Sequence, residues 1–213
     1  MPIRFPIASL FPILGAFLAF AFVHKKNIIL FSGLSFLLIF TYGYFFYPHL
    51  LYKKGQANGP NVRYTNKLFE VPLISIKGDT VLLRDTLNAE INLIEFFFVG
   101  CIPCEEKLVA IDSLLRSYKR SQFNVVNICS GHHTSFEKFK KYTSKKDKSE
   151  FIYLYAPDST LGKLYGHEWG FPFEQVITKN RIFISKQIGY DPSYEKLYIK
   201  NKIKQIEKYA KDH

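Results

Sequence analysis

Residues 91–104 of this 213-residue chain read INLIEFFFVGCIPC, and they carry its clearest structural signal. The run from Ile91 to Val99 is almost continuously apolar, and Glu95 is its one charged residue. Such a run predicts a strand buried on both faces, as in the centre of a sheet that helices cover. Apolar residues then recur at helical spacing over 105–120. Cys101 and Cys104 therefore lie where a buried strand passes into a helix.

Strand-like and helix-like segments alternate along the chain after residue 67. A Gly78-Asp79 pair between the first two apolar runs is typical of a hairpin turn. We expect strands at 68–76, 81–84, 91–99, 123–129, 151–155, 175–178 and 182–185, and helices at 105–120, 135–142, 159–165 and 193–210. This order predicts an α/β sandwich, in which helices flank a central mixed sheet.

Charged residues are nearly absent from the first 52 positions. That segment holds Arg4, Lys25 and Lys26 and no acidic residue, whereas the rest of the chain holds the other 26 of 29 basic residues and all 18 acidic ones. This asymmetry excludes a single soluble domain. Three cysteines in a chain of this length are also too few for a disulfide-stapled scaffold.

Two uncharged apolar stretches, 5–23 and 28–47, fill most of this segment. Each is long enough to cross a hydrocarbon core of about 30 Å as a helix. Four polar residues separate them, and Pro48 is expected to end the second. A cleaved signal peptide is the alternative for the first stretch, with Ala19-Phe20-Ala21 as its cleavage site.

The domain boundaries follow from these stretches. We predict a two-helix transmembrane hairpin in 1–52, a polar linker in 53–67 and a globular domain in 68–213. Basic residues flank the hairpin on both sides, so the positive-inside rule leaves its orientation open.

The Cys101-Ile102-Pro103-Cys104 sequence has the spacing of a redox-active pair. Unpaired amide hydrogens and the helix dipole favour a thiolate at the start of a helix, so we expect Cys101 to be the nucleophile. Cys104, one turn inside, is expected to resolve the mixed disulfide. Pro103 suits the first helical turn, where its missing amide hydrogen costs nothing. A structural zinc site shares this spacing but needs a second pair of ligands, which the single further cysteine does not provide.

Further features accompany the pair. The hairpin with the Gly-Asp turn comes first, and Leu93–Phe97 then leads into the cysteines. Asp158 precedes a short helix that ends in Tyr165-Gly166, and Gly170-Phe171-Pro172 precedes the last hairpin. Together these features resemble the thioredoxin superfamily, specifically the membrane-anchored, extracytoplasmic thiol-disulfide oxidoreductases of the TlpA/ResA type. The resemblance runs from about Phe69 to the C-terminus.

The resemblance implies a thioredoxin-like fold and dithiol–disulfide exchange at Cys101 and Cys104. Protein dithiols and disulfides would be the partners, and no diffusible cofactor would be needed. Pro172 falls where the family carries its cis-proline, against Cys101, and is expected to act in catalysis. Two positions of the expected substrate groove depart from the family, because Gly100 replaces a usual tryptophan and Phe173 a common threonine. The expected groove residues are Gly100, Ile102, Pro103, Phe171 and Phe173.

Glu95 lies six residues before Cys101, where thioredoxins place a buried acid. A carboxyl group in an apolar strand is disfavoured as an anion, so its pKa should be raised. Such an acid can take or give the proton that exchange at Cys104 moves. We expect this catalytic role, and the alternative is that Glu95 meets a lysine or a solvent-exposed edge and is structural.

Cys129 is the last residue of the next predicted strand, and two histidines follow it shortly afterwards. Cys129 is expected to be a small buried residue, and a third redox thiol or a metal ligand is the alternative. His132 and His133 are expected in a solvated loop. The lysine-rich run 140–148 is expected to be a solvated surface, and we predict no nucleic-acid binding.

The leading functional prediction is a thiol-disulfide oxidoreductase of a bacterial-type inner membrane. Its soluble domain would lie on the extracytoplasmic side, where a tether is of use because soluble thioredoxin is absent. Glu105 and Glu106 oppose a thiolate at the helix start, which favours a reducing role. The oligomeric state is not predicted.

Two alternatives remain open. In the first, a copper-binding protein would use Cys101, Cys104 and one of His132, His133 or His167 as ligands. In the second, the domain is chiefly an interaction module of a larger membrane complex. The two-residue spacing of the cysteines and Pro172 count against copper delivery.

Overall fold

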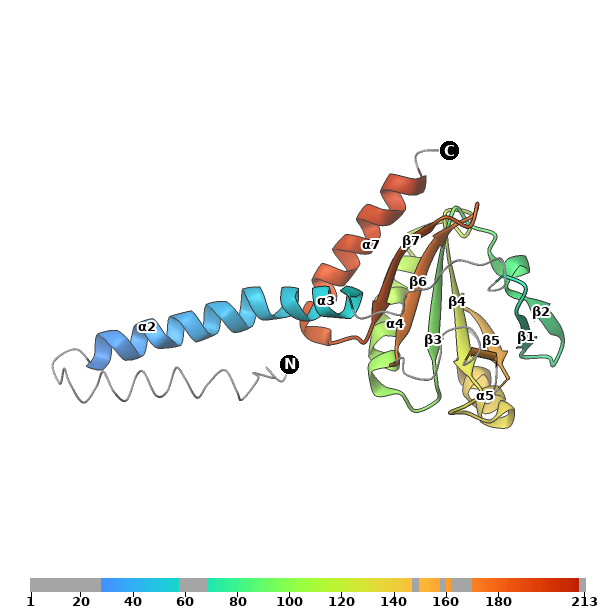
Figure 1. Ribbon diagram of the computed structural model, residues 1–213, viewed down its shortest axis with the longest axis horizontal. Coiled ribbons are helices and arrows are strands. Elements are labelled where there is room, and N and C mark those ends of the chain that lie inside the picture. The colour runs from blue at the N-terminus through green and yellow to red at the C-terminus, as the bar shows by residue number, and fades with distance from the viewer. Residues whose placement is uncertain (1–27, 58–68, 147–149, 158–159, 162–169, 211–213) are drawn as a thin grey trace. The chain divides into compact units, whose positions relative to one another are not determined.

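The computed structural model describes residues 28–57, 69–146, 150–157, 160–161 and 170–210 (Figure 1). The chain divides into two compact units, Met1–Tyr52 and Lys53–His213, and each is described by itself. The helix expected at 159–165 lies almost wholly outside the described residues, as does the apolar stretch 5–23.

A long helix occupies the second apolar stretch. It consists of α2 (Ile28–Thr41), a π-helical turn (Tyr42–Phe46) and α3 (Tyr47–Ala57), so the expected end at Pro48 is wrong. The amide of Tyr47 donates to the carbonyl of Tyr42, five residues back. This wider turn comes directly before Pro48, which then sits in the first turn of α3, where a proline needs no donor. The helix therefore continues into the first residues of the expected linker.

One helix among the described residues, Ser32–Gln56, is long and apolar enough to cross a membrane. Its most apolar window has a mean hydropathy of 1.3, and none of that window is buried. Length and composition do not by themselves separate a membrane span near the N-terminus from a signal sequence. The described residues thus contain one apolar N-terminal helix, and the other predicted helix of the hairpin, in 5–23, falls outside them.

The second unit is built on a seven-stranded mixed sheet with the order β2-β1-β5-β4-β3-β6-β7. The central strands β3, β4 and β5 are parallel, and β1 and β6 join them in antiparallel pairing. The strands are β1 (Pro72–Ser75), β2 (Thr80–Leu82), β3 (Ile91–Phe97), β4 (Phe123–Ser130), β5 (Ile152–Ala156), β6 (Phe173–Thr178) and β7 (Phe183–Ile188). The predicted mixed sheet and its central apolar strand are confirmed, since every residue of β3 is buried.

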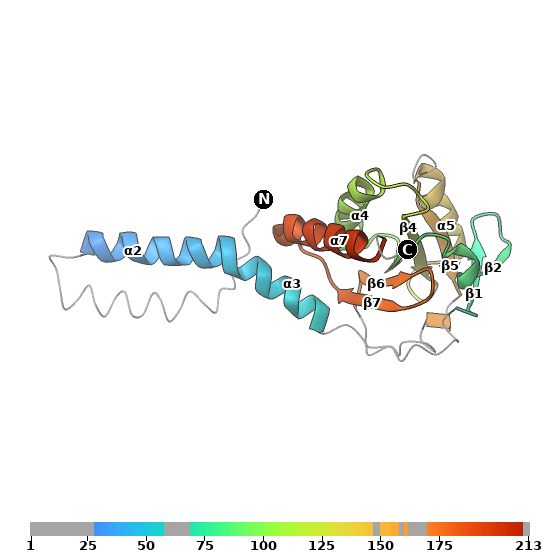
Figure 2. The ribbon, with the colours of Figure 1, turned by 90° about the horizontal axis from the view of Figure 1, so that it is seen from above.

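Three helices cover one face of this sheet (Figure 2). They are α4 (Ile102–Leu115), α5 (Phe136–Thr143) and α7 (Glu195–Ala210). Phe139 of α5 belongs there to one apolar cluster with Phe97 and Cys129, which lie opposite each other on β3 and β4. The opposite face carries the larger apolar core, in which Phe96 stacks on Phe173 with 5.4 Å between ring centroids. The face of β3 that carries Glu95, and the site that follows this strand, are therefore under helices, away from this core.

Local signals place the connections. Gly78 has a φ of +97°, a conformation that glycine adopts without strain, and it closes the predicted β1–β2 turn. The side chain of Ser135 accepts a hydrogen bond from the amide of Lys138 and so caps α5. The last helix is preceded by a short 3-10 turn, η6 (Pro192–Tyr194).

Candidate active site

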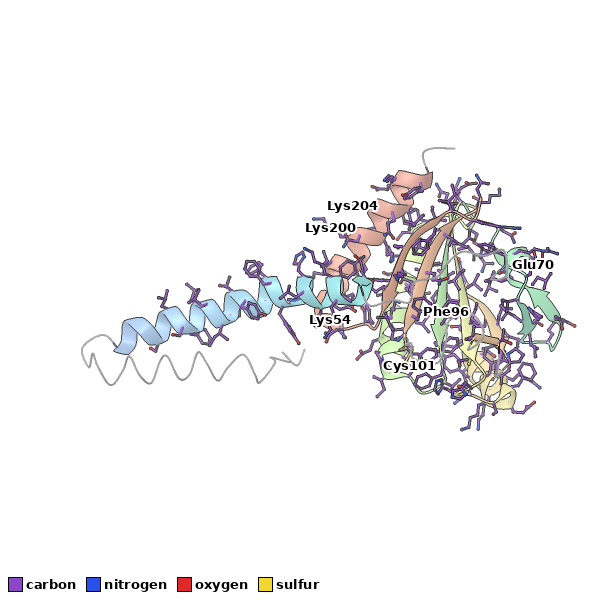
Figure 3. All side chains as sticks on the ribbon, in the orientation of Figure 1. Lys54, Glu70, Phe96, Cys101, Lys200 and Lys204 are labelled. Atoms are coloured by element: carbon purple, nitrogen blue, oxygen red, sulfur yellow. A yellow bond between two sulfur atoms is a disulfide. The ribbon has the colours of Figure 1, made fainter. Side chains whose placement is uncertain are left out.

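The cysteine pair lies at the junction that the sequence predicts. β3 ends at Phe97, and Cys101 is the N-cap of α4, beside its first turn (Figure 3). Cys101 and Cys104 form a disulfide, and the amide of Cys104 also donates to the sulfur of Cys101 at 3.3 Å. Both cysteines are nearly buried, with exposed fractions of 3% and 1%. The reacting sulfurs are thus held at a helix N-terminus, where the dipole stabilises a thiolate.

Gly100 explains one departure from the thioredoxin pattern. Its φ of +97° lies in the region that residues with a side chain rarely adopt. A tryptophan at this position would be strained by the backbone alone. Phe98 supplies an aromatic ring near the pair instead, because it packs against the cluster that contains Cys101 and Cys104.

The segment before β6 faces the same cluster. The Phe171–Pro172 peptide is cis, and the Phe171 side chain packs against the residues around the disulfide. The rings of Phe98, Phe171 and His133 lie in mutual contact, each pair with centroids 5.2 Å apart. Sequence reasoning missed Phe98, because its place in an apolar run reads as core, and it did not connect His133 with the loop of Pro172.

The expected groove residues are only partly brought together. Gly100 is exposed, Ile102 is 71% exposed and Pro103 is half-buried at the start of α4. Phe173, by contrast, is fully buried and stacks on Phe96 in the core of the opposite face, so its expected place in the groove is wrong. The reason is strand alternation: Phe173 is the first residue of β6, and its side chain points to the face away from α4.

Glu95 lies in a buried cluster of charges next to α4. The ammonium of Lys107 donates to Oε2 of Glu95 at 2.7 Å and lies 3.0 Å from Oε2 of Glu174. Glu174 also pairs with Lys202 of α7 and accepts a hydrogen bond from the hydroxyl of Tyr198. All four charged residues have exposed fractions of 2% or less. The alternative expectation placed Glu95 against a lysine, and this contact is present, with Lys107.

The other three charged members of this cluster were missed from the sequence. Lys107 stands at a position of α4 that the helical spacing assigns to the buried face, three residues after Cys104. Glu174 interrupts an apolar strand in the same way that Glu95 does. The sequence signal for these residues was a charge at an otherwise apolar position, and only Glu95 was recognised from it.

The two carboxyl groups have opposite pKa shifts. Burial raises the pKa of Glu95 to about 8, although Lys107 acts to lower it. Burial also acts to raise the pKa of Glu174, but the charges of Lys107 and Lys202 outweigh it and bring that pKa to about 2. Near neutral pH Glu174 is therefore the permanent anion of the cluster, and Glu95 is the carboxyl group that can change its protonation.

Comparisons with known proteins bear on the fold. Family models show no match to this chain, and no curated protein matches it. Solved structures do match. A thioredoxin-like protein from Porphyromonas gingivalis is 20% identical with a TM-score of 0.52, and 68% of this chain and 93% of that chain are covered. A proposed thioredoxin from Neisseria meningitidis is 21% identical with a TM-score of 0.51 and the same two coverages. A proposed thiol:disulfide interchange protein, DsbE, from Chlorobium tepidum is 20% identical with a TM-score of 0.50, and 63% of this chain and 92% of that chain are covered.

The chain has a thioredoxin-like fold. The predicted thioredoxin-like fold is thereby confirmed. Identities near 20% establish the fold alone, so the site's chemistry has to be argued from its residues. In this thioredoxin-like fold the disulfide begins α4 and the cis peptide precedes β6.

The two described histidines of the alternative copper site, His132 and His133, make aromatic ring contacts. His133 packs against Phe98 and Phe171, and His132 lies against His133 with ring centroids 4.8 Å apart. Within the described residues no three His, Cys, Asp or Glu side chains are grouped to hold a metal ion. His167 is outside those residues.

Cys129 is a buried free thiol at the end of β4. Burial raises its pKa to about 12, although Thr134 acts to lower it. It belongs to the same apolar cluster as the disulfide. A neutral, enclosed thiol of this kind behaves as a small apolar residue, in agreement with the main expectation.

The raised pKa of Glu95 predicts a specific pH dependence of stability. Because the pKa of folded Glu95 is about 8, the folded chain keeps this proton up to about pH 8, whereas the unfolded carboxyl group loses it near its ordinary pKa of 4.5. The free energy of unfolding is therefore expected to fall as pH rises through this window, by up to about 1.4 kcal/mol per pH unit. Urea titrations at several pH values should show this fall in the wild-type chain and a flatter profile in Glu95→Gln. Identical profiles for the two chains would contradict the assignment.

Proposed function

We propose that this protein is a membrane-anchored thiol-disulfide oxidoreductase that reduces disulfides of extracytoplasmic proteins. The observation that carries the proposal is the Cys101–Cys104 disulfide at the start of α4, beside the cis Phe171–Pro172 peptide. A disulfide at a helix N-terminus combines a stabilised thiolate with a second thiol one turn away. That combination is what dithiol–disulfide exchange requires.

The reaction begins with the dithiol form. The Cys101 thiolate attacks one sulfur of the partner disulfide, and the partner's other sulfur leaves with the electron pair and takes up a proton. Cys104 then gives up its proton, and its sulfur attacks the Cys101 sulfur of the mixed disulfide. The second partner sulfur leaves and is protonated. The partner has gained two electrons and two protons, and Cys101 and Cys104 are joined again.

Glu95 is proposed to accept the Cys104 proton. Cys104 and Lys107 lie on the same face of α4, and Lys107 holds the Glu95 carboxylate at 2.7 Å. A carboxyl group whose pKa is raised to about 8 can take and release a proton near neutral pH. No diffusible cofactor enters these steps, because the Cys101 and Cys104 thiols supply the electrons and the dithiol of a second partner protein would restore them.

The groove for the partner chain is proposed to comprise Gly100, Ile102, Pro103, Phe171 and Pro172. Backbone groups beside Pro172 would pair with the extended partner chain, and the exposed Ile102 would give it an apolar contact. The Phe98 and His133 rings extend this surface. Phe173 has no part in it because it is buried in the core.

The apolar N-terminal helix supports a membrane anchor, and we propose the two-helix hairpin with the domain on the extracytoplasmic side of a bacterial inner membrane. Intact cells treated with a membrane-impermeant thiol reagent after mild reduction should show labelling of Cys101. Cys129→Ser should leave the labelling unchanged. Labelling that appears only after lysis would place the domain on the cytoplasmic side.

The activity is tested with the full chain in detergent, equilibrated with glutathione redox buffers. We expect one reversible two-electron couple that is lost in Cys101→Ser and retained in Cys129→Ser. A parallel titration with Cu(I) addresses the copper-binding alternative. Tight Cu(I) binding without a measurable dithiol–disulfide couple would overturn the proposal.

A further inference from the structure

A row of polar side chains crosses the helix-covered face of the sheet. In strand register, Gln187 of β7 is opposite Glu174 of β6, Glu174 is opposite Glu95 of β3, and Glu95 is opposite Asn127 of β4. All four residues have an exposed fraction of 0%. Directly opposed residues on one face of a sheet lie about 5 Å apart at their Cβ atoms. Two carboxyl groups are therefore side by side in a site without water access.

Lys107 lies between these two carboxyl groups. Its ammonium is 2.7 Å from Glu95 and 3.0 Å from Glu174, and it comes from the helix that begins with the disulfide. Lys107 follows Cys104 by three positions, which puts the two residues on the same helix face. The Lys107 ammonium thus connects Glu95, beneath the cysteines, with β6, the strand that follows Pro172.

Glu174 and Glu95 differ in the further groups that surround them. Glu174 has additional partners, the ammonium of Lys202 and the hydroxyl of Tyr198, both from α7. Tyr194 of η6 is near enough to Lys107 for their charges to interact. On the other side of Glu95 in strand register is the neutral amide of Asn127, which has no hydrogen-bond partner among the described residues.

This inequality separates the roles of the two acids. Glu174 is fixed as an anion by two lysines and a hydroxyl group, so it balances the charge of Lys107 at all times. Glu95 has one charged partner, and its Oε1 has no hydrogen-bond partner within the described part of the chain. Glu95 can therefore take up or lose a proton without leaving Lys107 as an unpaired buried cation, which would be costly.

We propose that Lys107, shared between Glu95 and Glu174, is the positioning residue that sets when Glu95 carries a proton during disulfide exchange. The proposal rests on the function proposed above. In the second exchange step the Cys104 proton moves to the Glu95 carboxylate, the Cys104–Cys101 bond forms, and the Cys101–partner bond breaks with its electron pair on the partner sulfur. Lys107 then shifts its main ion pair from Glu95 to Glu174.

The arrangement requires two substitutions to act in opposite directions. Lys107→Gln removes the cation that favours the Glu95 anion, so the inflection of the pH–rate profile should move to higher pH. Glu174→Gln removes the competing anion and leaves Lys107 to Glu95, so the inflection should move to lower pH. Each shift is expected to be about one pH unit or more. A residue with a merely structural role would not give shifts of opposite sign.

The experiment measures the rate of exchange between the reduced full chain and oxidised glutathione from pH 5 to pH 10. Glu95→Gln is expected to lose the inflection, and the double variant Lys107→Gln/Glu174→Gln is expected to lie between the two single variants. Lys200→Gln is the matched control, because it removes the same charge from an exposed position of α7 (Figure 3). Near-ultraviolet circular dichroism identifies any variant that is not folded. If Lys107→Gln does not fold, the direction in which Glu174→Gln moves the inflection tests the proposal by itself.

The outcomes separate the two proposals. A wild-type chain without exchange activity would overturn the proposed function and this inference with it. A wild-type chain that exchanges normally, with variants whose inflections stay in place or move in the same direction, would overturn the role of Lys107 and leave the oxidoreductase intact.

Discussion

Serine in place of Cys104 is expected to trap the protein on its partners. Cys101 is then the single thiol at the start of α4, and it can attack a partner disulfide but has no second thiol to release it. Turnover should fall by on the order of a thousandfold or more, because the resolving step is lost. Non-reducing gels of cells that produce the variant should show mixed disulfides that collapse to the monomer after reduction.

The controls for this trap lie within the same chain. Cys101→Ser/Cys104→Ser should give no adducts, because the nucleophile is missing. Cys129→Ser should behave as the wild-type chain, since the Cys129 thiol is enclosed and its pKa is raised. Adducts that persist in the Cys101→Ser/Cys104→Ser chain would show that a different thiol reacts and would contradict the assignment of Cys101 as the nucleophile.

Replacing Glu174 by leucine is expected to produce the largest loss of stability that the structure indicates for a single change. Lys107 and Lys202 both pair with this carboxylate, and all three residues are buried. Breaking a buried ion pair by removing one partner typically costs about 3–5 kcal/mol, because a charge is left without compensation. Urea denaturation of the full chain, followed by far-ultraviolet circular dichroism, measures the change.

A surface ion pair provides the comparison. Glu70 and Arg84 approach to 2.7 Å but have side chains that are 45% and 41% exposed (Figure 3). Glu70→Leu should therefore change the free energy of unfolding by less than about 1 kcal/mol. Adding Lys202→Met to Glu174→Leu should recover part of the loss, because one buried cation is removed with its partner. Equal effects of Glu70→Leu and Glu174→Leu would contradict the burial argument.

The sequence predicted most of the fold because its strongest patterns are local. The apolar run before Cys101 became β3, the Gly78-Asp79 pair became a hairpin turn, and Ser135 became a helix cap. Strand-to-helix alternation predicted the mixed sheet, and the resemblance to the thioredoxin superfamily implied the cis peptide at Pro172. Each of these features depends on a few neighbouring residues.

The predictions that were wrong or missing depend on contacts between distant segments or, for Pro48, on an unusual helical turn. Pro48 continues a helix because a wider turn precedes it, and nothing in its immediate neighbours indicated that turn. Phe173 was assigned to the groove by its position after Pro172, but strand alternation turns it toward Phe96. The meeting of Glu95 and Glu174 depends on the register between β3 and β6, which a single sequence does not reveal.

The contact between α7 and Glu174 has a consequence for how such chains diverge. Tyr198 and Lys202 approach the carboxylate from the last helix, whereas Lys200 and Lys204 of the same helix are exposed. Relatives should therefore vary freely at the outer positions of this helix. Where the acid at position 174 has become apolar, we expect the lysine at position 202 to have been replaced in the same lineage, as a compensating change that sequence covariation would reveal.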